Sequence, residues 1–167
     1  MINIVLVEPE IPQNAGNIVR TCAAIKAKLY MVKPLGFILD DKHFKRAGMD
    51  YFDIASITVV DSFKEILDKN QDVKFYYAST KSKNIYSDVT YPDGCFIVFG
   101  KESRGLSENI LKNNYDNCIR IPMSENARSL NLSNSVAIIA YEAMKQQGFD
   151  SLETQGELTG RVEYDEF

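Results

Sequence analysis

The sequence predicts an α/β fold with a mainly parallel sheet flanked by helices. Short apolar runs of strand length recur along the chain, and most are followed by a segment with helical spacing. Such alternation produces parallel strands whose sheet is covered by helices on both faces. The runs are Ile2–Val7, Leu29–Val32, Ile57–Val60, Val73–Ala78, Cys95–Phe99 and Cys118–Ile121. A length of 167 residues with 45% hydrophobic content suits one domain with a closed core.

The segment after the first run is predicted to be an amphipathic helix. Its apolar stripe consists of Ile18, Cys22 and Ile25, and its polar stripe of Gln13, Asn17 and Arg20. Residues at these spacings share one face of a helix. Arg20 is therefore expected to point away from the core, near the carboxyl edge of the sheet, where open α/β sheets commonly bind ligands.

The last predicted helix, about Leu132 to Gln147, differs from an ordinary surface helix. Its stretch Val136–Tyr141 is apolar on every face, and a helix of this kind needs cover on more than one side. In a domain this small, a second copy of the chain is the expected cover. The sequence thus predicts a homodimer.

Charge divides the chain into a body, residues 1–149, and an acidic carboxyl-terminal tail, residues 150–167. The net charge is −4, of which the tail contributes −5, so the body carries +1. The tail is expected to be dispensable for chemistry, and truncation after Gly148 to retain activity. Its apolar residues, which we expect to dock on the body or on a partner chain, are Leu152, Leu158, Val162, Tyr164 and Phe167.

Several classes of protein are disfavoured. No signal peptide and no apolar segment of membrane-spanning length is present, so a cytoplasmic protein without membrane attachment is expected. Three cysteines without metal-ligand spacing predict buried reduced thiols, and with a single histidine no metal is expected. A P-loop is excluded because Leu106 follows Gly105 where a phosphate-binding lysine is required, and no dinucleotide-binding glycine motif follows a strand.

Three polar clusters lie where strand-like runs meet helix-like runs. They are Asn14–Arg20, Phe99–Leu106 and Ser129–Val136, and Ile121-Pro122-Met123 precedes the third. Serine and asparagine suit a helix N-terminus, but the third cluster has more polar groups than one cap needs. The glycines of the second suit a tight loop that approaches a flat ligand closely.

In this order the clusters resemble the three signature motifs of the SPOUT class of S-adenosylmethionine-dependent RNA methyltransferases. The similarity is closest to the short single-domain type that methylates the ribose 2′-hydroxyl of cytidine or uridine at the tRNA wobble position. It extends to about Gly148, and Lys101 departs from it, since an uncharged residue is expected there. The resemblance implies a deep trefoil knot near the carboxyl-terminal strands.

The resemblance also implies the site residues. Those expected to contact S-adenosylmethionine are Ala78, Gly100, Glu102, Ile121, Met123, Ser129 and Leu130. Those expected to serve the reaction are Asn14, Arg20, Glu102, Ser129 and Asn131. A guanidinium is effectively always protonated, so Arg20 is expected to orient a phosphate and stabilise the developing alkoxide rather than act as a base. Glu102 is expected to hold its loop or to receive a proton.

The RNA partner is expected to be the tRNA anticodon loop, whose unstacked nucleotides a small site can reach. The basic residues expected to contact its backbone are Lys26, Lys28, Lys33, Lys42, Lys45 and Arg46, with a merely solvated face as the alternative. Two other functions stay open: a catalytically silent RNA-binding module, and a 2′-O-methyltransferase acting at another RNA position. The latter is less favoured for ribosomal RNA, because this length leaves no room for an additional RNA-binding domain.

Overall fold

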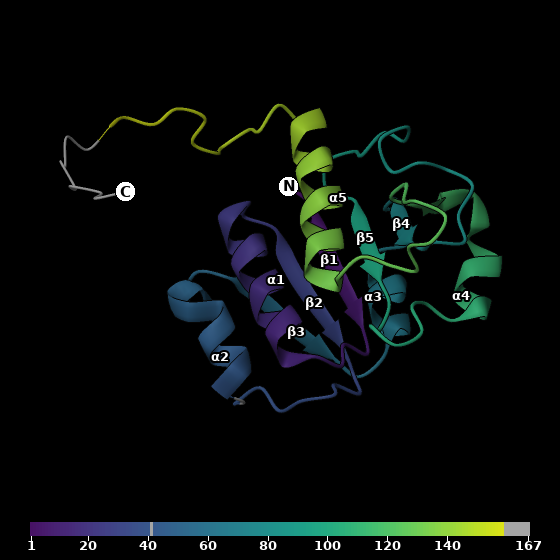
Figure 1. Cartoon of the computed structure of the whole chain (residues 1–167), viewed down its shortest axis with the longest axis horizontal. Helices are drawn as coiled ribbons and strands as arrows, with labels where there is room; N and C mark the ends of the chain where they lie inside the picture. Colours follow the sequence, from purple (N-terminus) through teal and green to yellow (C-terminus); the bar gives the residue numbers. More distant parts are fainter. Residues whose placement is uncertain (41, 159–167) are drawn as a thin grey trace.

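The computed structural model describes residues 1–40 and 42–158, and its centre is a six-stranded sheet in the order β3-β2-β1-β5-β4-β6 (Figure 1). Every strand pairing is parallel. The strands are β1 (Asn3–Val7), β2 (Lys28–Val32), β3 (Ser56–Val60), β4 (Phe75–Ala78), β5 (Phe96–Phe99) and β6 (Cys118–Ile119). The predicted fold class is confirmed.

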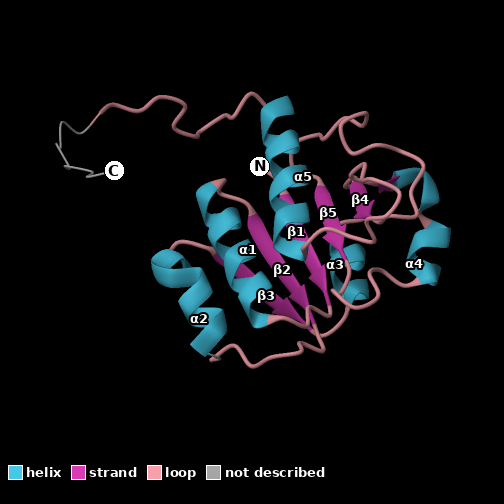
Figure 2. Ribbon diagram, viewed as in Figure 1, coloured by secondary structure: helices cyan, strands magenta, loops and turns pink. Residues whose placement is uncertain are grey.

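Helices cover both faces of this sheet, as Figure 2 shows. They are α1 (Pro12–Ala24), α2 (Lys42–Gly48), α3 (Phe63–Lys69), α4 (Glu108–Asn113) and α5 (Leu132–Gln146), with 3-10 helices η1 (Met49–Asp53) and η2 (Tyr115–Asn117). On one face, Ile18 of α1 and Ile139 of α5 belong to a core with Ile4 and Leu6 of β1. On the other face, α3 and α4 pack against a second core that contains Val5.

The predicted strands agree with the structure, except that β6 is shorter than the expected Cys118–Ile121. The chain leaves the sheet after Ile119. Arg120 instead pairs with Ile85 of the loop after β4, and Pro122 cannot donate a ladder hydrogen bond. As a result, Ile121 and Met123 are released from the sheet and line a cavity described below.

The strand order reverses between β1 and β5, which follow one another in the sheet but not in the sequence. Helix α1 begins just after β1, and the loop of residues 100–107 follows β5. The carboxyl ends of parallel strands lie on one edge, and ligands of open α/β sheets bind there where the strand order reverses. Two of the three polar clusters therefore meet at this point.

The loop after β4 is bonded to the chain around β6. Ser82 is buried, and its hydroxyl donates to the Cys118 carbonyl over 2.6 Å. The Arg120 amide donates to the Asn84 carbonyl, and the Tyr86 amide to the Arg120 carbonyl, each over 2.9 Å. The threading of a knot near these carboxyl-terminal strands stays a prediction.

Helix α1 has the orientation that its sequence predicts. Ile18, Cys22 and Ile25 are buried, although Ile25 follows the last helical residue, and Arg20 is exposed. The thiols of Cys22, Cys95 and Cys118 are buried and free, as expected. Within residues 1–40 and 42–158, no cluster of three potential metal ligands occurs. None of the described helices is long and apolar enough to cross a membrane.

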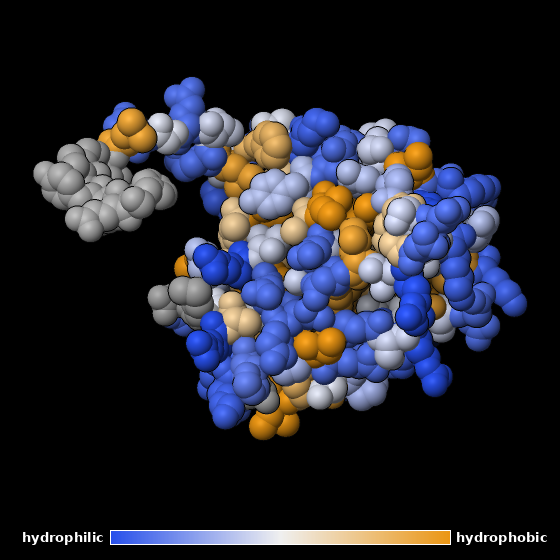
Figure 3. Space-filling view, in the orientation of Figure 1, coloured by the Kyte–Doolittle hydropathy of each residue, from blue (hydrophilic) through white to orange (hydrophobic). Residues whose placement is uncertain are grey.

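Helix α5 buries only part of its apolar surface in one chain. Val136, Ile139, Ala140 and Met144 are in the core, whereas Ile138 is 36% exposed and Tyr141 is 46% exposed. Figure 3 shows apolar side chains gathered on this side of the molecule. The exposed residues are those for which the sequence predicts a second cover.

The chain beyond α5 stays attached to the body for several residues. Phe149 and Leu152 pack against the core beside α1 and α5, and the Phe149 amide donates to the Met144 carbonyl over 2.9 Å. Leu158 is fully exposed. The other apolar tail residues, Val162, Tyr164 and Phe167, lie outside the described part of the chain. Packing against the core thus extends to Leu152, and the division of the chain into a body and a tail at residue 149 stays a prediction.

Candidate active site

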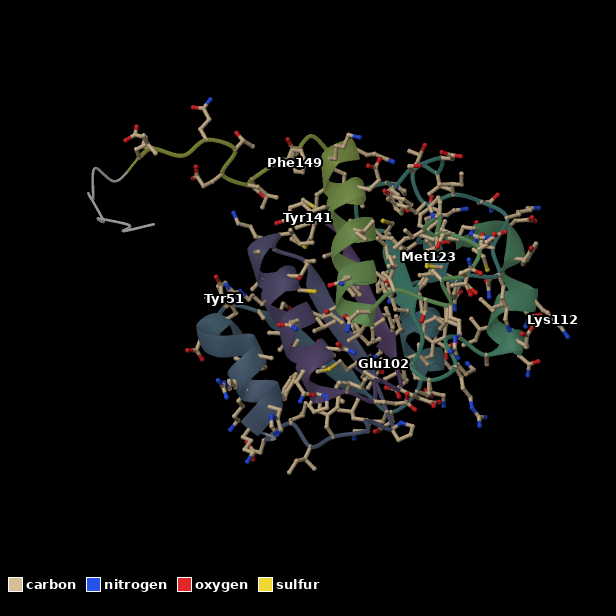
Figure 4. All side chains as sticks on the ribbon, in the orientation of Figure 1. Tyr51, Glu102, Lys112, Met123, Tyr141 and Phe149 are labelled. Carbon is tan, nitrogen blue, oxygen red and sulfur yellow. The ribbon has the colours of Figure 1, made fainter. Side chains whose placement is uncertain are left out.

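A cavity of about 630 Å³ opens at the carboxyl ends of β4, β5 and β6. Its walls include nine of the ten residues that the sequence predicts for the site: Asn14, Ala78, Gly100, Glu102, Ile121, Met123, Ser129, Leu130 and Asn131. In Figure 4, Glu102 and Met123 lie on the loops around this part of the molecule. Arg20, the tenth predicted residue, does not line the cavity. The three polar clusters thus contribute to one site.

Glu102 is the centre of the hydrogen bonds that join these loops. One carboxylate oxygen accepts from the Glu10 amide over 2.8 Å. The other accepts from the Ile11 amide over 3.2 Å and from Asn14 Nδ2 over 3.0 Å. These donors lie at the beginning of α1, where backbone N–H groups have no helical partner and favour a negative charge. Glu102 therefore fixes the start of α1 to the loop after β5.

Asn14 extends this network to the third cluster. It is 5% exposed, and its Oδ1 accepts from Asn131 Nδ2 over 2.9 Å. Asn131 caps α5, because its Oδ1 accepts from the Ser133 amide over 2.9 Å and from the Asn134 amide over 3.4 Å. Both polar ends of the Asn14 side chain are thus used to connect Glu102 with Asn131.

Two further contacts tie the loop after β1 to the loop after β5. The carboxylate of Glu10 accepts from the Ser103 amide over 2.9 Å and from the Ser103 hydroxyl over 2.8 Å. These bonds, with Lys101 and Arg104 nearby, hold the pKa of Glu10 below its usual value. Lys101 donates to Glu8 over 2.6 Å. The residue that departs from the SPOUT motif is therefore engaged in an ion pair at the site.

Gly100 is required by the tight packing of this loop. A Cβ on Gly100 would lie 2.1 Å from the Gly105 carbonyl carbon and 2.2 Å from the Leu106 amide nitrogen. Gly105 itself has a φ of +69°, which glycine adopts without strain. The two glycines fold the loop back on itself, so its backbone forms one wall of the cavity.

The chemistry of the lining suits a ligand with an apolar flat part and polar ends. Leu106, Leu111, Ile119 and Ile139 supply apolar surface, and Ile121 and Leu130 lie at the wall. Ser79, Thr80, Ser129 and Ser135 supply hydroxyl groups around them. A cavity that combines apolar surface with convergent polar groups is typical of a small-molecule site.

Four basic residues that the sequence did not point to also line the cavity. They are Lys81, Arg104, Arg120 and Arg128, and only Lys81 makes a salt bridge within the described chain, to Glu108. Arg104 and Arg128 are exposed and Arg120 is half-buried. Two of them could have been found from the sequence, since Arg104 lies within the second cluster and Arg128 immediately precedes the third.

Arg20 lies on α1 away from the cavity. Its guanidinium carbon is 5.3 Å from the centre of the Tyr51 ring, which belongs to η1. Six residues separate Arg20 from Asn14, or about 9 Å along a helix. Figure 4 shows Tyr51 at the end of α2, on the far side of α1 from Glu102. Within one chain, the expected reaction residues are therefore divided between two places.

The six basic residues expected to contact RNA do not form one patch. Lys26 and Lys28 are at the amino end of β2, whereas Lys33 follows its carboxyl end. Lys26 Nζ donates to the Ser151 carbonyl over 2.7 Å, and Lys33 pairs with Asp61 over 2.9 Å. On α2, Lys45 pairs with Asp40 over 2.6 Å, and the remaining two, Lys42 and Arg46, are exposed.

A second cavity, of about 740 Å³, lies under the loop after β2. Its lining is largely apolar, with Phe37, Ile38 and Val59, and its charged residues are Lys33, Asp40 and Asp61. None of the predicted site residues lines it. The arrangement of Asn14, Glu102 and Asn131 identifies the cavity at the carboxyl ends of β4, β5 and β6 as the candidate active site.

The sequence is similar to one protein family and to several known proteins over most of its length. Residues 1–141 match the SpoU rRNA Methylase family. The chain is 50% identical to a protein of Listeria monocytogenes over 153 residues, which cover 90% of each chain. It is 42% identical to the tRNA (cytidine(34)-2'-O)-methyltransferase of Escherichia coli K12, over 89% of this chain and 96% of the relative.

A solved structure described as "Structural insights into the 2-OH methylation of C/U34 on tRNA" has the same architecture. It superposes with a TM-score of 0.85 at 38% sequence identity, and the match covers 89% of this chain and 97% of the other. The similarity therefore extends over nearly the whole fold.

Proposed function

Because the chain belongs to the SpoU rRNA methylase family, we propose that it transfers a methyl group to the 2′-hydroxyl of the wobble ribose of tRNA, on cytidine or uridine 34. The observation that carries this proposal is the convergence of three separate motifs on one cavity through Glu102, Asn14 and Asn131. Relatives named tRNA (cytidine(34)-2'-O)-methyltransferase match nearly the whole chain. A tRNA substrate also favours a cytoplasmic location.

The methyl donor is S-adenosylmethionine, whose sulfonium supplies an electrophilic methyl group when bound. The cavity fits such a molecule in kind, since its lining contains both apolar side chains and hydroxyl groups. Gly100, Ile121, Met123 and Leu130 would hold the donor, with Ala78 at the end of β4. The reaction itself calls for no metal, because the protein has only to position the hydroxyl and remove its proton.

Glu102 and Asn131 serve this reaction by positioning. Both carboxylate oxygens of Glu102 accept bonds from N–H donors, which favours holding the loops over receiving a proton. The Asn131 side chain caps α5 and donates to Asn14. Ser129 is exposed in the cavity wall. We therefore propose that its hydroxyl contacts the methyl donor or the ribose.

Arg20 orients a phosphate next to the reacting ribose and stabilises the alkoxide as its proton leaves. This role uses the permanent charge of the guanidinium and its several N–H donors. Because Arg20 lies outside the cavity of its own chain, we infer that it acts in a homodimer. A second copy packed on α1 and α5 would bring its own Arg20 toward the mouth of the first cavity.

The exposed apolar residues favour this dimer. Leu130, Ile138 and Tyr141 are 38%, 36% and 46% exposed, and all three belong to α5 or the segment that leads into it. Ile11, at the start of α1, is 42% exposed. Helices α1 and α5 pack side by side on the same face of the sheet (Figure 1). Burial of these side chains by a second copy would remove apolar surface from water.

The anticodon loop binds through cations near the cavity. Arg104, Arg120 and Arg128 form no salt bridge with the described acidic residues, so their charge is available to RNA phosphates. Lys42 and Arg46, exposed on α2, are proposed as further contacts with the RNA backbone outside this group, and Lys33 and Lys45 would exchange their ion pairs for phosphates. Lys26 and Lys28, at the opposite edge of the sheet, contribute at a greater distance.

The test is methyl transfer from labelled S-adenosylmethionine to tRNA from a strain that lacks this gene, with mapping at nucleotide resolution. We expect one 2′-O-methyl group, on nucleotide 34. Transfer to a base, or to a ribose outside the anticodon loop, would contradict the proposal. Binding of tRNA without any transfer would identify a catalytically silent RNA-binding module instead.

A further inference from the structure

We propose that Tyr51 is a positioning residue that holds the Arg20 guanidinium in the orientation needed for methyl transfer. The proposal rests on the proposed function of Arg20. The guanidinium carbon lies 5.3 Å from the centre of the Tyr51 ring, within the range of a cation–π interaction. A cation–π contact holds the charged end of the Arg20 side chain. It therefore limits the conformations of this long, flexible side chain before RNA binds.

The backbone of Tyr51 is held by two hydrogen bonds. The Tyr51 carbonyl accepts hydrogen bonds from the Ile54 amide over 3.2 Å and from the Ala55 amide over 2.9 Å. These bonds end the short helix η1 and leave the backbone of Tyr51 little freedom. A fixed backbone keeps the Tyr51 ring within reach of Arg20.

The neighbouring residue anchors η1 in the core. Phe52 packs edge-on against Phe44 of α2, with 4.8 Å between ring centres. Its ring also fills the space next to Gly48, where a Cβ would lie 2.1 Å from a Phe52 ring carbon. Phe52 thus faces the core while Tyr51 lies against α1 at Arg20.

Close packing between α1 and α2 brings Tyr51 near Arg20. Gly16 of α1 faces α2, and a Cβ there would lie 2.6 Å from both the Ala47 Cβ and the Phe44 carbonyl oxygen. A larger residue would push α2 away from α1 and carry η1 with it. Gly16 is one turn before Arg20 on α1, so the distance between the helices is set next to the Arg20–Tyr51 contact.

Tyr51 has no direct access to the cavity, since it is absent from the lining. Figure 4 shows it at the end of α2, well separated from Glu102 and Met123. Within its own chain, Tyr51 can therefore influence methyl transfer only through Arg20 or through the stability of the fold. The two routes predict different results in kinetic measurements.

The experiment compares Tyr51→Leu, which removes the ring, with Tyr51→Phe, which keeps it. We expect Tyr51→Leu to lower kcat about three- to tenfold. This factor corresponds to the energy of a cation–π contact that is only partly buried. Tyr51→Phe should keep kcat within about twofold of the unchanged protein, because the ring face is retained. The Kd for S-adenosylmethionine should be unchanged in both variants.

Tyr30→Leu is a matched control for general loss of packing. Tyr30 is a half-buried tyrosine of β2 that packs on Phe96, in the core on the opposite face of the sheet. We expect this variant to lower the unfolding midpoint without changing kcat at a temperature where it is folded. An equal loss of kcat in Tyr30→Leu and Tyr51→Leu would overturn the proposal.

A double-mutant cycle separates the proposal from the function of Arg20. In an Arg20→Gln background, which removes the cation, loss of the Tyr51 ring should lower the residual kcat less than in the unchanged protein. Additive effects would show that Tyr51 acts independently of Arg20. If Arg20→Ala keeps full activity, the function proposed for Arg20 is wrong. If Arg20→Ala is inactive but both Tyr51 variants keep full kcat, only the positioning role is wrong.

Discussion

Asn131 donates a hydrogen bond of 2.9 Å to Asn14, although 117 residues separate them in the sequence. Asn14 in turn donates to Glu102 over 3.0 Å, across 88 residues. One buried side chain therefore connects the loops after β1 and β5 with the cap of α5. The shape of the cavity depends on this connection, since all three residues belong to its wall.

Replacement of Asn14 should weaken both stability and activity. Asn14→Ala removes two hydrogen bonds, one of them to a charged carboxylate, and we expect a loss of about 2–3 kcal/mol in the free energy of unfolding. Asn14→Asp should be worse, because a second carboxylate would face Glu102. Denaturant unfolding and kcat measure the effect. Asn17→Ala, on the exposed stripe of the same helix, should stay within about 0.5 kcal/mol.

Removal of a cation from the cavity wall should weaken RNA binding selectively. We expect Arg128→Ala to raise the KM for tRNA, to leave the Kd for S-adenosylmethionine within a few fold, and to reduce the slope of log K against log salt by about one. Lys112→Ala is the control, since Lys112 does not line the cavity and points away from it in Figure 4. An equal effect of both changes would argue against contact with RNA at Arg128.

A charge on the exposed face of α5 should separate the homodimer. Ile138→Lys places an ammonium group where apolar contact with a second copy is proposed. Sedimentation should change from twice the chain mass of 18.9 kDa to a single chain, with loss of methyl transfer. Ile38→Lys is the control. Ile38 is 71% exposed but lies on the loop after β2, away from α5, so this change should leave the dimer intact. Full activity of a single chain would contradict the dimer.

The buried thiols should make stability fall at alkaline pH. Burial raises the pKa of Cys22 and of Cys95 to about 12, from an ordinary value of 9.0. The unfolded chain therefore loses these protons first, and their contribution to stability, complete below pH 9, is lost as pH rises toward 12. Denaturant midpoints between pH 8 and 11 should show this decline, to which Tyr77 adds, since burial raises its pKa to about 12 as well.

A thiol reagent provides the accompanying check. At pH 8 the folded protein should not react with Ellman's reagent on the time scale of minutes, whereas all three cysteines should react after denaturation. Rapid reaction of a thiol in the folded protein would show that this cysteine is accessible.

The position of a carboxyl-terminal truncation should matter within a few residues. Truncation after Leu152 should keep stability and methyl transfer, because the packed residues Phe149 and Leu152 remain. Truncation after Gly148 removes both, and we expect it to cost about 1–3 kcal/mol of unfolding free energy. The structure thus adds a stability cost to the sequence-based expectation that this shorter chain stays active. Equal melting temperatures for the two forms would show that the contacts of Phe149 and Leu152 contribute little.

The sequence predicts the elements of this fold well because buried parallel strands are continuous apolar runs. Helix α1 was equally predictable, since its burial follows the spacing of Ile18 and Cys22. The length of β6 was not, because Cys118 to Ile121 is apolar enough for a longer strand. Only the position of the loop after β4 shows that Arg120 pairs with that loop instead.

The site was predictable in composition but not in its connections. Motif resemblance brings Asn14, Glu102 and Asn131 to one site, yet it does not show that Glu102 accepts bonds from the backbone of Glu10 and Ile11. Nor does spacing show that Lys26 and Lys33 lie at opposite ends of β2. Such facts depend on tertiary contacts between distant segments, which local patterns do not contain.

The late position of Asn131 has a consequence for synthesis of the protein. A chain emerging from the ribosome presents β1, α1 and β5 long before residue 131, so Asn14 and Glu102 can meet while the wall from Ser129 to Asn131 is still missing. The ribosome synthesises a chain from its amino terminus at about 5–20 residues per second. The cavity can close only after the start of α5 has been added, and an incomplete chain therefore has no finished site with which to bind or modify RNA.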